Sequence, residues 1–346
     1  MENFLIEEDK AIVDAMKQLE QSAKRILFLH KQGMLLASLT DGDIRRCILE
    51  KGDLQLPVKY AANYNPQFLY EDQSKLAIDI MKGHAIDAIP IVDQAHFIKD
   101  IIFLNAPAQK KGKFSEELPV VIMAGGQGTR LFPYTNILPK PLIPIGDYPI
   151  VEHVINCFLE YGCRHFYMVV NYKRNMIKAY FDELEKEYSV DFVDEEKALG
   201  TGGGISLLKG KVKNTFLLTN CDILIEEDLS KAYQQHRDSG NLITMVCSLK
   251  NFTIPYGVVE IGEKGVIQSI HEKPGLSFFT NTGCYFVEEE VIERLKYNEP
   301  IDFPSIIEMY MEEGRKIGVY PISENAWLDM GQFDELERMK ERLGYN

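Results

Sequence analysis

The sequence predicts an α/β protein in which a doubly wound, mixed sheet is preceded by a smaller α+β module. The apolar run at 118–124 does not alternate with polar residues, which is typical of a strand buried on both faces, and it leads into a glycine-rich turn. Later strand patterns, at 165–170, 215–219 and 242–247, are separated by polar helical segments, which favours helices on both faces of one sheet. Before residue 106, a strand–turn–strand–helix pattern occurs twice instead.

Length and composition are those of a globular protein with two domains. The 346 residues suffice for two domains, and a hydrophobic fraction of 45% with 26% charged residues argues against global disorder. No apolar run approaches the roughly 20 residues of a membrane span, so we expect no membrane partner. The amino terminus lacks the form of a secretory signal, and six scattered cysteines form no C-x-x-C pair. We therefore expect a cytoplasmic protein with reduced thiols.

The net charge limits the partners that the chain can bind. A formal charge of −14 disfavours nucleic acid, because binding to a phosphate backbone normally needs a basic stripe. It does not exclude a small phosphorylated ligand, since a few Arg and Lys side chains in a cleft can reverse the field locally.

The first module is predicted to span residues 1–108 as a pseudo-symmetric pair. Strand patterns at 26–29 and 34–39 precede a helical pattern at 43–49, and strand patterns at 88–92 and 97–103 follow the same order. Helical patterns at 10–20 and 75–82 precede the two strand pairs. A stretch rich in Pro, Gly and Lys at 106–114 is typical of an exposed linker. We place the linker at 109–117, ahead of a second domain at 118–346.

Two strings in the first module resemble a known domain. GMLLASLTDGD, at 33–43, resembles the core of a CBS domain, and IPIVD, at 89–93, resembles the matching strand of its partner. The resemblance implies a tandem CBS module whose T-x-x-D residues, Thr40 and Asp43, hold the ribose of an adenine nucleotide. The same two residues also fit a helix capping box, and the second repeat lacks a T-x-x-D directly after IFLN at 102–105. A role in regulation, packing or dimerisation therefore stays open beside nucleotide binding.

The most informative motif is GGQGTRL, at 125–131, followed by PKP at 139–141. Glycines let backbone N–H groups approach phosphate oxygens, and Arg130 and Lys140 add positive charge. The spacing is neither that of a P-loop nor the G-x-G-x-x-G of an NAD-dependent oxidoreductase. The motif resembles the signature of the sugar-phosphate nucleotidyltransferases, among them mannose-1-phosphate and glucosamine-1-phosphate guanylyltransferases. That family has a Rossmann-like, glycosyltransferase-A-like fold.

The rest of the second domain resembles the other motifs of that family, in the family's order. NCD at 220–222 and WLDMG at 327–331 supply two aspartates for Mg²⁺, and LGTGG at 199–203 resembles the turn over the base and sugar. EKP at 272–274 lies between YGVVE and NTGCY, which resemble sugar-site segments. The resemblance implies these roles: catalytic, Arg130, Lys140 and Lys273; nucleotide-binding, Ala124, Gly125, Gly126, Gly128, Thr129, Glu195, Gly200 and Thr201; sugar-binding, Tyr256, Gly257, Glu272, Asn281 and Thr282; metal-binding, Asp222 and Asp329.

The resemblance also implies the reaction. A sugar-phosphate oxygen attacks the α-phosphorus of a nucleoside triphosphate in line, pyrophosphate leaves, and no nucleophilic side chain is needed. Arg130 is expected to bind the triphosphate, Lys140 the α-phosphate and Lys273 the sugar phosphate. The EKP glutamate, Glu272, is expected to hold sugar hydroxyls, while Mg²⁺ bridges the two reactants.

The base and the sugar are less constrained. Glu195 lies where the family contacts the base, and a carboxylate accepts both adjacent donors of guanine but only one from uracil, which favours GTP over UTP. A UTP-using member of the family stays open. A CBS pair ahead of the transferase resembles bacterial enzymes that make GDP-linked amino sugars, which implies glucosamine 1-phosphate. The alternative is a non-catalytic nucleotide sensor, and for either interpretation we expect a homo-oligomer.

Overall fold

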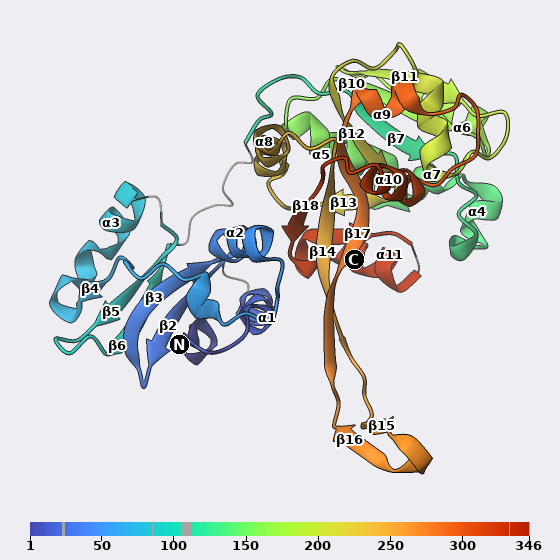
Figure 1. The fold of residues 1–346 in the computed structure, drawn as a ribbon. Helices are drawn as coiled ribbons and strands as arrows, with labels where there is room; N and C mark the ends of the chain where they lie inside the picture. Colours follow the sequence, from blue (N-terminus) through green and yellow to red (C-terminus); the bar gives the residue numbers. More distant parts are fainter. Residues whose placement is uncertain (23–24, 85, 105–111, 332, 346) are drawn as a thin grey trace. The chain divides into compact units, whose positions relative to one another are not determined.

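The computed structural model describes residues 1–22, 25–84, 86–104, 112–331 and 333–345 (Figure 1). These residues form two compact units, Met1–Lys110 and Lys111–Asn346. The predicted linker at 109–117 lies partly outside the described residues. Phe114, inside that predicted linker, is buried and stacks on Tyr161 with ring centroids 4.9 Å apart, so it belongs to the core of the second unit.

The N-terminal unit repeats one topology in two three-stranded sheets. In each sheet, the first strand runs parallel to the second, and the second pairs antiparallel with the third. Backbone bonds join the two sheets, as where the Leu35 N–H donates to the His96 carbonyl over 2.9 Å. The elements are β1 (Leu5–Glu7), α1 (Ile12–Ser22), β2 (Ile26–Lys31), β3 (Met34–Thr40), α2 (Asp41–Lys51), β4 (Leu69–Tyr70), α3 (Ala77–His84), β5 (Ala88–Val92) and β6 (Ile98–Phe103).

The C-terminal unit is built on a seven-stranded mixed sheet with the order β11-β10-β7-β12-β17-β14-β18. Of these strands, β17 alone runs antiparallel to its neighbours. Parallel strands bring their carboxyl ends to one edge, where ligands of α/β sheets bind. The strands are β7 (Val120–Ala124), β10 (His165–Val170), β11 (Ser189–Asp194), β12 (Thr215–Asn220), β14 (Ile243–Thr253), β17 (Gly275–Glu288) and β18 (Ile317–Ile322).

Helices cover both faces of this sheet because its strands are apolar on both sides. Val120 and Ile122 of β7 belong to one hydrophobic cluster, and Val121 between them belongs to another. The first cluster includes residues of α5, α6, α8 and α11, and the second includes residues of α9 and α10. The helices are α4 (Tyr134–Ile137), α5 (Ile150–Glu160), α6 (Arg174–Glu183), α7 (Gly200–Gly203), α8 (Leu229–Ser239), α9 (Glu289–Arg294), α10 (Phe303–Glu312) and α11 (Phe333–Arg342).

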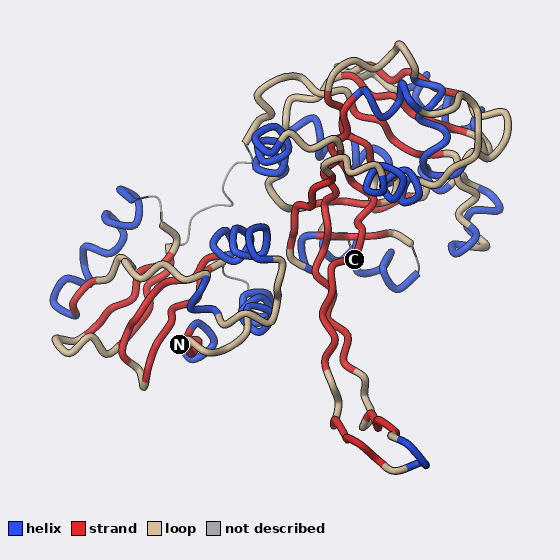
Figure 2. Tube along the Cα trace, in the orientation of Figure 1, coloured by secondary structure: helices blue, strands red, loops and turns tan. Residues whose placement is uncertain are grey.

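Three small two-stranded sheets complete the C-terminal unit. They are β8 (Pro144–Ile145) with β9 (Tyr148–Pro149), β13 (Ile223–Ile225) with β19 (Trp327–Asp329), and β15 (Val258–Ile261) with β16 (Ile267–His271). The β15–β16 hairpin stands at the end of a ribbon, because β14 and β17 continue to pair with each other beyond the other strands of the large sheet (Figure 2).

The six cysteines are reduced thiols, and five of them are buried. Burial raises the pKa of Cys163, Cys221, Cys247 and Cys284 to about 12, so these thiols are neutral at physiological pH. No helix among the described residues is long and apolar enough to cross a membrane.

Candidate functional site

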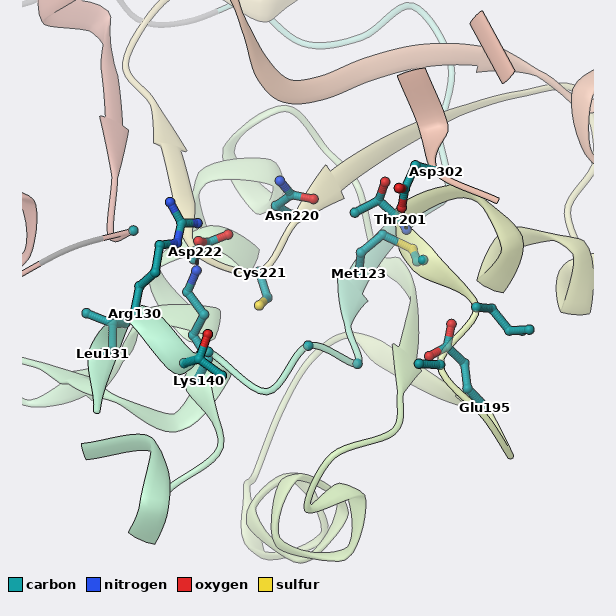
Figure 3. A pocket seen from close by; sticks show the side chains of 18 residues that line it. Met123, Arg130, Leu131, Lys140, Glu195, Thr201, Asn220, Cys221, Asp222 and Asp302 are labelled. Atoms are coloured by element: carbon teal, nitrogen blue, oxygen red, sulfur yellow. Dashed lines mark hydrogen bonds and ion pairs between the residues drawn. The ribbon is translucent and has the colours of Figure 1, made fainter. Parts of the chain in front are cut away.

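The glycine-rich turn after β7 lines a cavity of about 420 Å³, the first cavity, at the carboxyl ends of β7, β11 and β12 (Figure 3). In Figure 3, Arg130, Lys140 and Asp222 gather at one side of the cavity and Glu195 lies at the other. The lining residues are Met123, Gly125, Gly126, Gly128, Thr129, Arg130, Leu131, Lys140, Glu195, Ala198, Leu199, Gly200, Thr201, Asn220, Cys221, Asp222, Asp302 and Gly331.

The turn needs glycine at two positions for different reasons. At Gly125, a Cβ atom would lie 2.7 Å from Oε2 of Glu195, so no side chain fits between the turn and that carboxylate. Gly128 has a φ of +65°, which favours glycine, and its carbonyl accepts a hydrogen bond from the Thr135 hydroxyl over 3.0 Å. These two glycines leave the backbone of the turn open to the cavity.

Charged side chains meet at one end of the first cavity. The Lys140 ammonium donates to the Asp222 carboxylate, and both side chains are largely buried. Burial lowers the pKa of Lys140, but the charge of Asp222, the hydrogen bond to it and the smaller contributions of neighbouring groups together outweigh burial, and the net pKa is raised. Asp329 lies opposite Ile223 in the β13–β19 pair. Burial first, and then the charge of Asp222, raise the pKa of Asp329 to about 6.

These two carboxylates fit Mg²⁺. Asp222 is buried and Asp329 is half-buried, and they lie close enough for the charge of Asp222 to raise the pKa of Asp329, so a divalent cation between them would remove that repulsion. Mg²⁺ is usually held by one or two carboxylates together with substrate phosphates. The described residues contain no group of three or more His, Cys, Asp or Glu side chains placed to hold a metal without a substrate.

Glu195 lies at the opposite side of the first cavity, directly after β11. It is 5% exposed, and its Oε1 atom is buried without a hydrogen-bond partner. Burial raises the pKa of its carboxyl to about 7, against a hydrogen bond with Asn171 that lowers it. An unpaired buried carboxyl oxygen is costly, so this atom is suited to accept a hydrogen bond from a bound ligand.

The second glycine turn is held by the segment that begins α10. Gly200 has a φ of +77°, and a Cβ atom there would lie 2.6 Å from Oδ1 of Asp302. The Thr201 N–H donates to the same Asp302 oxygen over 3.2 Å, and the Phe303 N–H donates to the Thr201 hydroxyl over 3.0 Å. This turn is therefore a fixed wall of the cavity and not a free loop.

A second cavity, of about 250 Å³, adjoins the first, and both are lined by Arg130, Asp222, Asn220, Thr201 and Met123. Asn281 and Thr282 of β17 line it, and their side chains are fixed by local bonds. The Asn281 amide donates to the Tyr285 hydroxyl over 2.6 Å, and the Thr282 hydroxyl donates to the Val246 carbonyl over 2.7 Å. The other lining residues are Leu218, Ile223, Gly283, Tyr285, Phe303, Pro304, Trp327 and Asp329.

Each cavity is lined by one residue that has a buried polar atom without a partner. Among the described residues, three buried side-chain nitrogen or oxygen atoms have no hydrogen bond, on Glu195, Trp327 and Tyr310. Glu195 lines the first cavity and Trp327 lines the second. Buried polar groups are nearly always paired. A ligand in the first cavity would therefore donate a hydrogen bond to the Glu195 carboxylate, and a ligand in the second cavity would accept one from the Trp327 indole N–H.

Most of the residues predicted from the sequence converge on the two cavities, and some do not. Ala124 is buried at the end of β7 and lines neither cavity. Tyr256, Gly257, Glu272 and Lys273 lie beside the β15–β16 hairpin and line neither cavity. The catalytic role of Lys273 and the sugar-binding roles of the other three residues stay predictions.

Thr40 and Asp43 lie in the N-terminal unit and form the capping box at the start of α2. The Asp43 N–H donates to the Thr40 hydroxyl over 3.2 Å, and the Thr40 N–H donates to the Asp43 carboxylate over 2.8 Å. This is the structural alternative that the sequence left open. Binding of an adenine nucleotide by this pair stays a prediction.

Sequence reasoning missed three residues of the site. Asn220 precedes Asp222 at the end of β12, so its place at a strand end was a usable signal. Trp327 belongs to the segment that supplied Asp329, and its indole N–H becomes notable only once its burial is known. Asp302 carries no local signal, because its role depends on contact with a turn that lies a hundred residues earlier.

Comparisons with known proteins agree with this geometry. The profile of the nucleotidyl transferase family matches residues 119–344. The chain is 32% identical over 229 residues to the bifunctional protein GlmU of Methanococcus vannielii, a match that covers 62% of this chain and 52% of that protein. It is 29% identical to the mannose-1-phosphate guanylyltransferase of Mycobacterium tuberculosis (65% and 64% covered) and 28% identical to the UTP–glucose-1-phosphate uridylyltransferase of Synechocystis (62% and 60%).

The likeness to these relatives extends over part of their length. The chain spans about half the length of the first relative and less than two thirds of the other two. Among solved structures, HddC from Yersinia pseudotuberculosis shares the fold, with a TM-score of 0.52, 23% identity and coverage of 65% of this chain and 99% of that one. The family profile spans the sheet, both glycine turns and both aspartates, and on that basis this chain belongs to the nucleotidyl transferase family.

Proposed function

We propose that this chain joins a nucleoside triphosphate to a sugar 1-phosphate and releases pyrophosphate. The observation that carries the proposal is that Arg130 and Asp222 line both of two adjoining cavities. One cavity has a glycine turn suited to phosphates, and the other has polar side chains from an antiparallel strand. Two phosphorylated reactants must be held next to each other in order to react, and two adjoining cavities that share lining residues would hold them in that way.

In the proposed reaction, a sugar-phosphate oxygen attacks the α-phosphorus in line and pyrophosphate leaves. The chain positions two polyanions and neutralises their charge, and no side chain forms a covalent bond. Arg130 would bind the triphosphate and the departing pyrophosphate. Lys140 would hold the α-phosphate, and its raised pKa keeps it protonated at neutral pH. Asp222 and Asp329 would hold Mg²⁺, which when bound supplies positive charge to the phosphate oxygens of both reactants.

GTP is the nucleotide that we propose. The unpartnered Oε1 of Glu195 and its neighbouring oxygen form an acceptor pair, and guanine offers two adjacent donors, N1–H and the 2-amino group. Uracil offers one donor between two acceptors and leaves one carboxylate oxygen unpaired. A UTP-using enzyme is the alternative within the family.

For the sugar we propose glucosamine 1-phosphate, bound in the second cavity. Asn281, Thr282 and the unpartnered N–H of Trp327 offer hydrogen-bonding groups of both kinds there. Lys273 and Glu272 remain the proposed partners of the sugar phosphate and the sugar hydroxyls.

The N-terminal unit is proposed to be a tandem CBS module with a role in packing or dimerisation. The hydroxyl of Thr40 and the carboxylate of Asp43 are engaged in capping α2, which favours this role over binding of an adenine nucleotide. We also propose a cytoplasmic homo-oligomer, in line with a reaction that consumes nucleoside triphosphates.

The test is pyrophosphate release from purified protein and Mg²⁺ with GTP, UTP, CTP, dTTP and ATP, each against a panel of sugar 1-phosphates. We expect release with GTP and glucosamine 1-phosphate, and none after EDTA is added. Release with UTP alone would replace the guanylyltransferase by a uridylyltransferase. Nucleotide binding without turnover on any sugar, from folded protein, would favour the non-catalytic sensor.

A further inference from the structure

The β15–β16 hairpin presents an apolar face to solvent. Val259 pairs with Ile270 and Ile261 with Ile267, so these four side chains share one face of the hairpin. They are 45–72% exposed. On the other face, the Ser269 hydroxyl donates to the Glu260 carboxylate over 2.6 Å. An amphipathic hairpin with a solvated apolar face is typical of a surface that another protein covers.

The ribbon that carries this hairpin also lacks neighbours. Beyond Ser248 the partner strand β18 stops pairing with β14, and before Cys284 the strand β12 no longer pairs with β17 (Figures 1 and 2). We call residues 252–278 the arm. At its base, Phe252 and Phe278 stack with centroids 5.4 Å apart, and both rings are about half exposed. A two-stranded ribbon alone is marginally stable in water, so an arm of this length needs a covering surface.

The paired backbone of the arm prevents the arm from folding back onto the second cavity of its own chain. The β14–β17 register is unbroken from Cys247↔Asn281 to Thr253↔Gly275, and the Ile254 N–H then donates to the Pro274 carbonyl over 3.0 Å. Along an extended strand, Gly275 lies about 20 Å from Asn281, which lines the second cavity. To reach that cavity, residues 272–274 of the same chain would have to break this ladder of paired backbone groups.

The arm carries the chemistry that the second cavity lacks. Among the described residues lining that cavity, Arg130 is the only cationic side chain, and it stands beside Asp222 and Asp329. A sugar 1-phosphate dianion calls for a further cation. The arm holds Lys273 at a φ of +47°, next to Glu272, whose carboxylate lies so close to Gly257 that a Cβ atom there would be 2.9 Å from Oε2. The polar group is thus preformed on the arm.

We propose that the arm docks on a second copy of this chain, and that Glu272 and Lys273 of one copy complete the second cavity of the other. The proposal rests on the proposed function, because it assigns the sugar-phosphate contacts of that reaction. The second copy is the occupant that the observations favour, since the group on the arm matches the charge missing from the cavity. In a two-fold pair the exchange is reciprocal, and both apolar hairpin faces are covered.

Hetero-oligomers of two inactive variants test this proposal. Two copies, one with Asp222→Asn and one with Lys273→Ala, are co-expressed with different tags and purified by both tags in turn. If the arm acts in trans, the copy with an intact core receives an intact Lys273, and pyrophosphate release is about half that of the wild type. If the arm acts in cis, both sites are defective and release stays at the level of the single variants, which would overturn the proposal.

The inverse pairing is the matched control. A wild-type copy is combined with a copy that carries both Asp222→Asn and Lys273→Ala. The trans arrangement predicts almost no release, because the intact core receives the defective arm. The cis arrangement predicts half of the wild-type rate. The two hetero-oligomers therefore give opposite results under the two arrangements, and subunit loss alone cannot mimic both.

A second measurement does not depend on turnover. Light scattering should find the wild-type protein as a dimer or larger oligomer, dissociated further by Ile270→Lys on the apolar face than by Ser269→Lys on the polar face. If no substrate pair supports turnover in the wild type, the proposed function fails and this measurement alone decides on docking. A monomeric wild-type protein, or equal masses for the two lysine variants, would contradict docking through the apolar face.

Discussion

At the scale of single residues, Asp222 carries the largest part of the proposed chemistry. It lines both cavities, accepts from Lys140 and lies close enough to Asp329 to raise the pKa of that carboxyl. Replacing it removes an interaction made mainly in the transition state. We expect Asp222→Asn to lower kcat by about 10²-fold or more with little change in KM for the nucleotide.

Pyrophosphate release at saturating Mg²⁺ measures this effect. Asp191→Asn, which makes the same change of charge on an exposed β11 side chain, should leave the rate unchanged. An Asp222→Asn variant with full turnover in Mg²⁺ would remove the metal role of this residue.

Glu195 predicts how nucleotide binding depends on pH. Its carboxyl has a pKa of about 7, and only the ionised form accepts both guanine donors. Binding must therefore remove the proton below pH 7 and is free of this cost above it. We expect the Kd for GTP to be about tenfold higher at pH 6 than at pH 8, as linkage requires.

Calorimetric titration without sugar phosphate gives this Kd across the pH range. Glu195→Gln is the matched variant, because it keeps the shape of the side chain and does not titrate, so the remaining pH dependence is that of the nucleotide phosphates. If both proteins show the same pH profile, Glu195 does not contact the base.

At the scale of elements, the second glycine turn should tolerate no side chain at Gly200. A Cβ atom there would meet the Asp302 carboxylate and the Ile301 carbonyl. Gly210 has a similar φ of +71° but open space around it, so Gly210→Ala carries the same backbone strain without the clash. We expect both variants to lose about 1 kcal/mol of stability from strain, and Gly200→Ala alone to raise KM for the nucleotide.

Urea unfolding and steady-state kinetics separate the two effects. Equal kinetics for the two alanine variants would mean that the turn at 199–203 does not shape the nucleotide site.

The same scale shows what the sequence could predict. The strand pattern at 165–170 matches β10, and the run at 118–124 ends where β7 ends, because buried parallel strands leave a clear apolar signature. The rule that ligands bind at strand carboxyl ends was enough to bring Asp222 together with the glycine turn.

The arm could not be predicted in this way. The sequence pattern ended the strand near residue 247, whereas β14 runs to Thr253. The additional residues of β14 pair with β17, which comes later in the chain. The alternation of polar and apolar residues within one segment does not encode such a long-range pairing. For the same reason, the position of Glu272 and Lys273 relative to Asn281 could not be inferred from their order in the chain.

At the scale of the whole molecule, both cavities lie in the C-terminal unit, so ligand binding should stabilise that unit. On the proposed function, Mg²⁺ with GTP would bind the folded C-terminal unit and not the unfolded chain. The free energy of unfolding of the C-terminal unit should rise by about 2.7 kcal/mol when the nucleotide concentration is 100 times the Kd of the nucleotide. The N-terminal unit has its own cores and should gain nothing directly.

Hydrogen exchange resolves this prediction by segment. Protection should increase in β7, β12 and α7, and stay unchanged in β2 and β5. Protection of β2 and β5 by GTP would instead indicate a nucleotide site in, or strong coupling to, the N-terminal unit.

The order of strands in the large sheet bears on how the protein is made. The central strand β12 pairs on one side with β7, which precedes it, and on the other with β17, which comes later in the chain, while Asp222 meets its fellow carboxylate on β19. During synthesis, a ribosome-bound chain that has emerged only as far as the first glycine turn, the second turn and Asp222 still lacks the strand that holds Asp329. Until β19 has left the ribosome and paired with β13, a nascent chain therefore lacks one of the two carboxylates that are proposed to hold the metal ion.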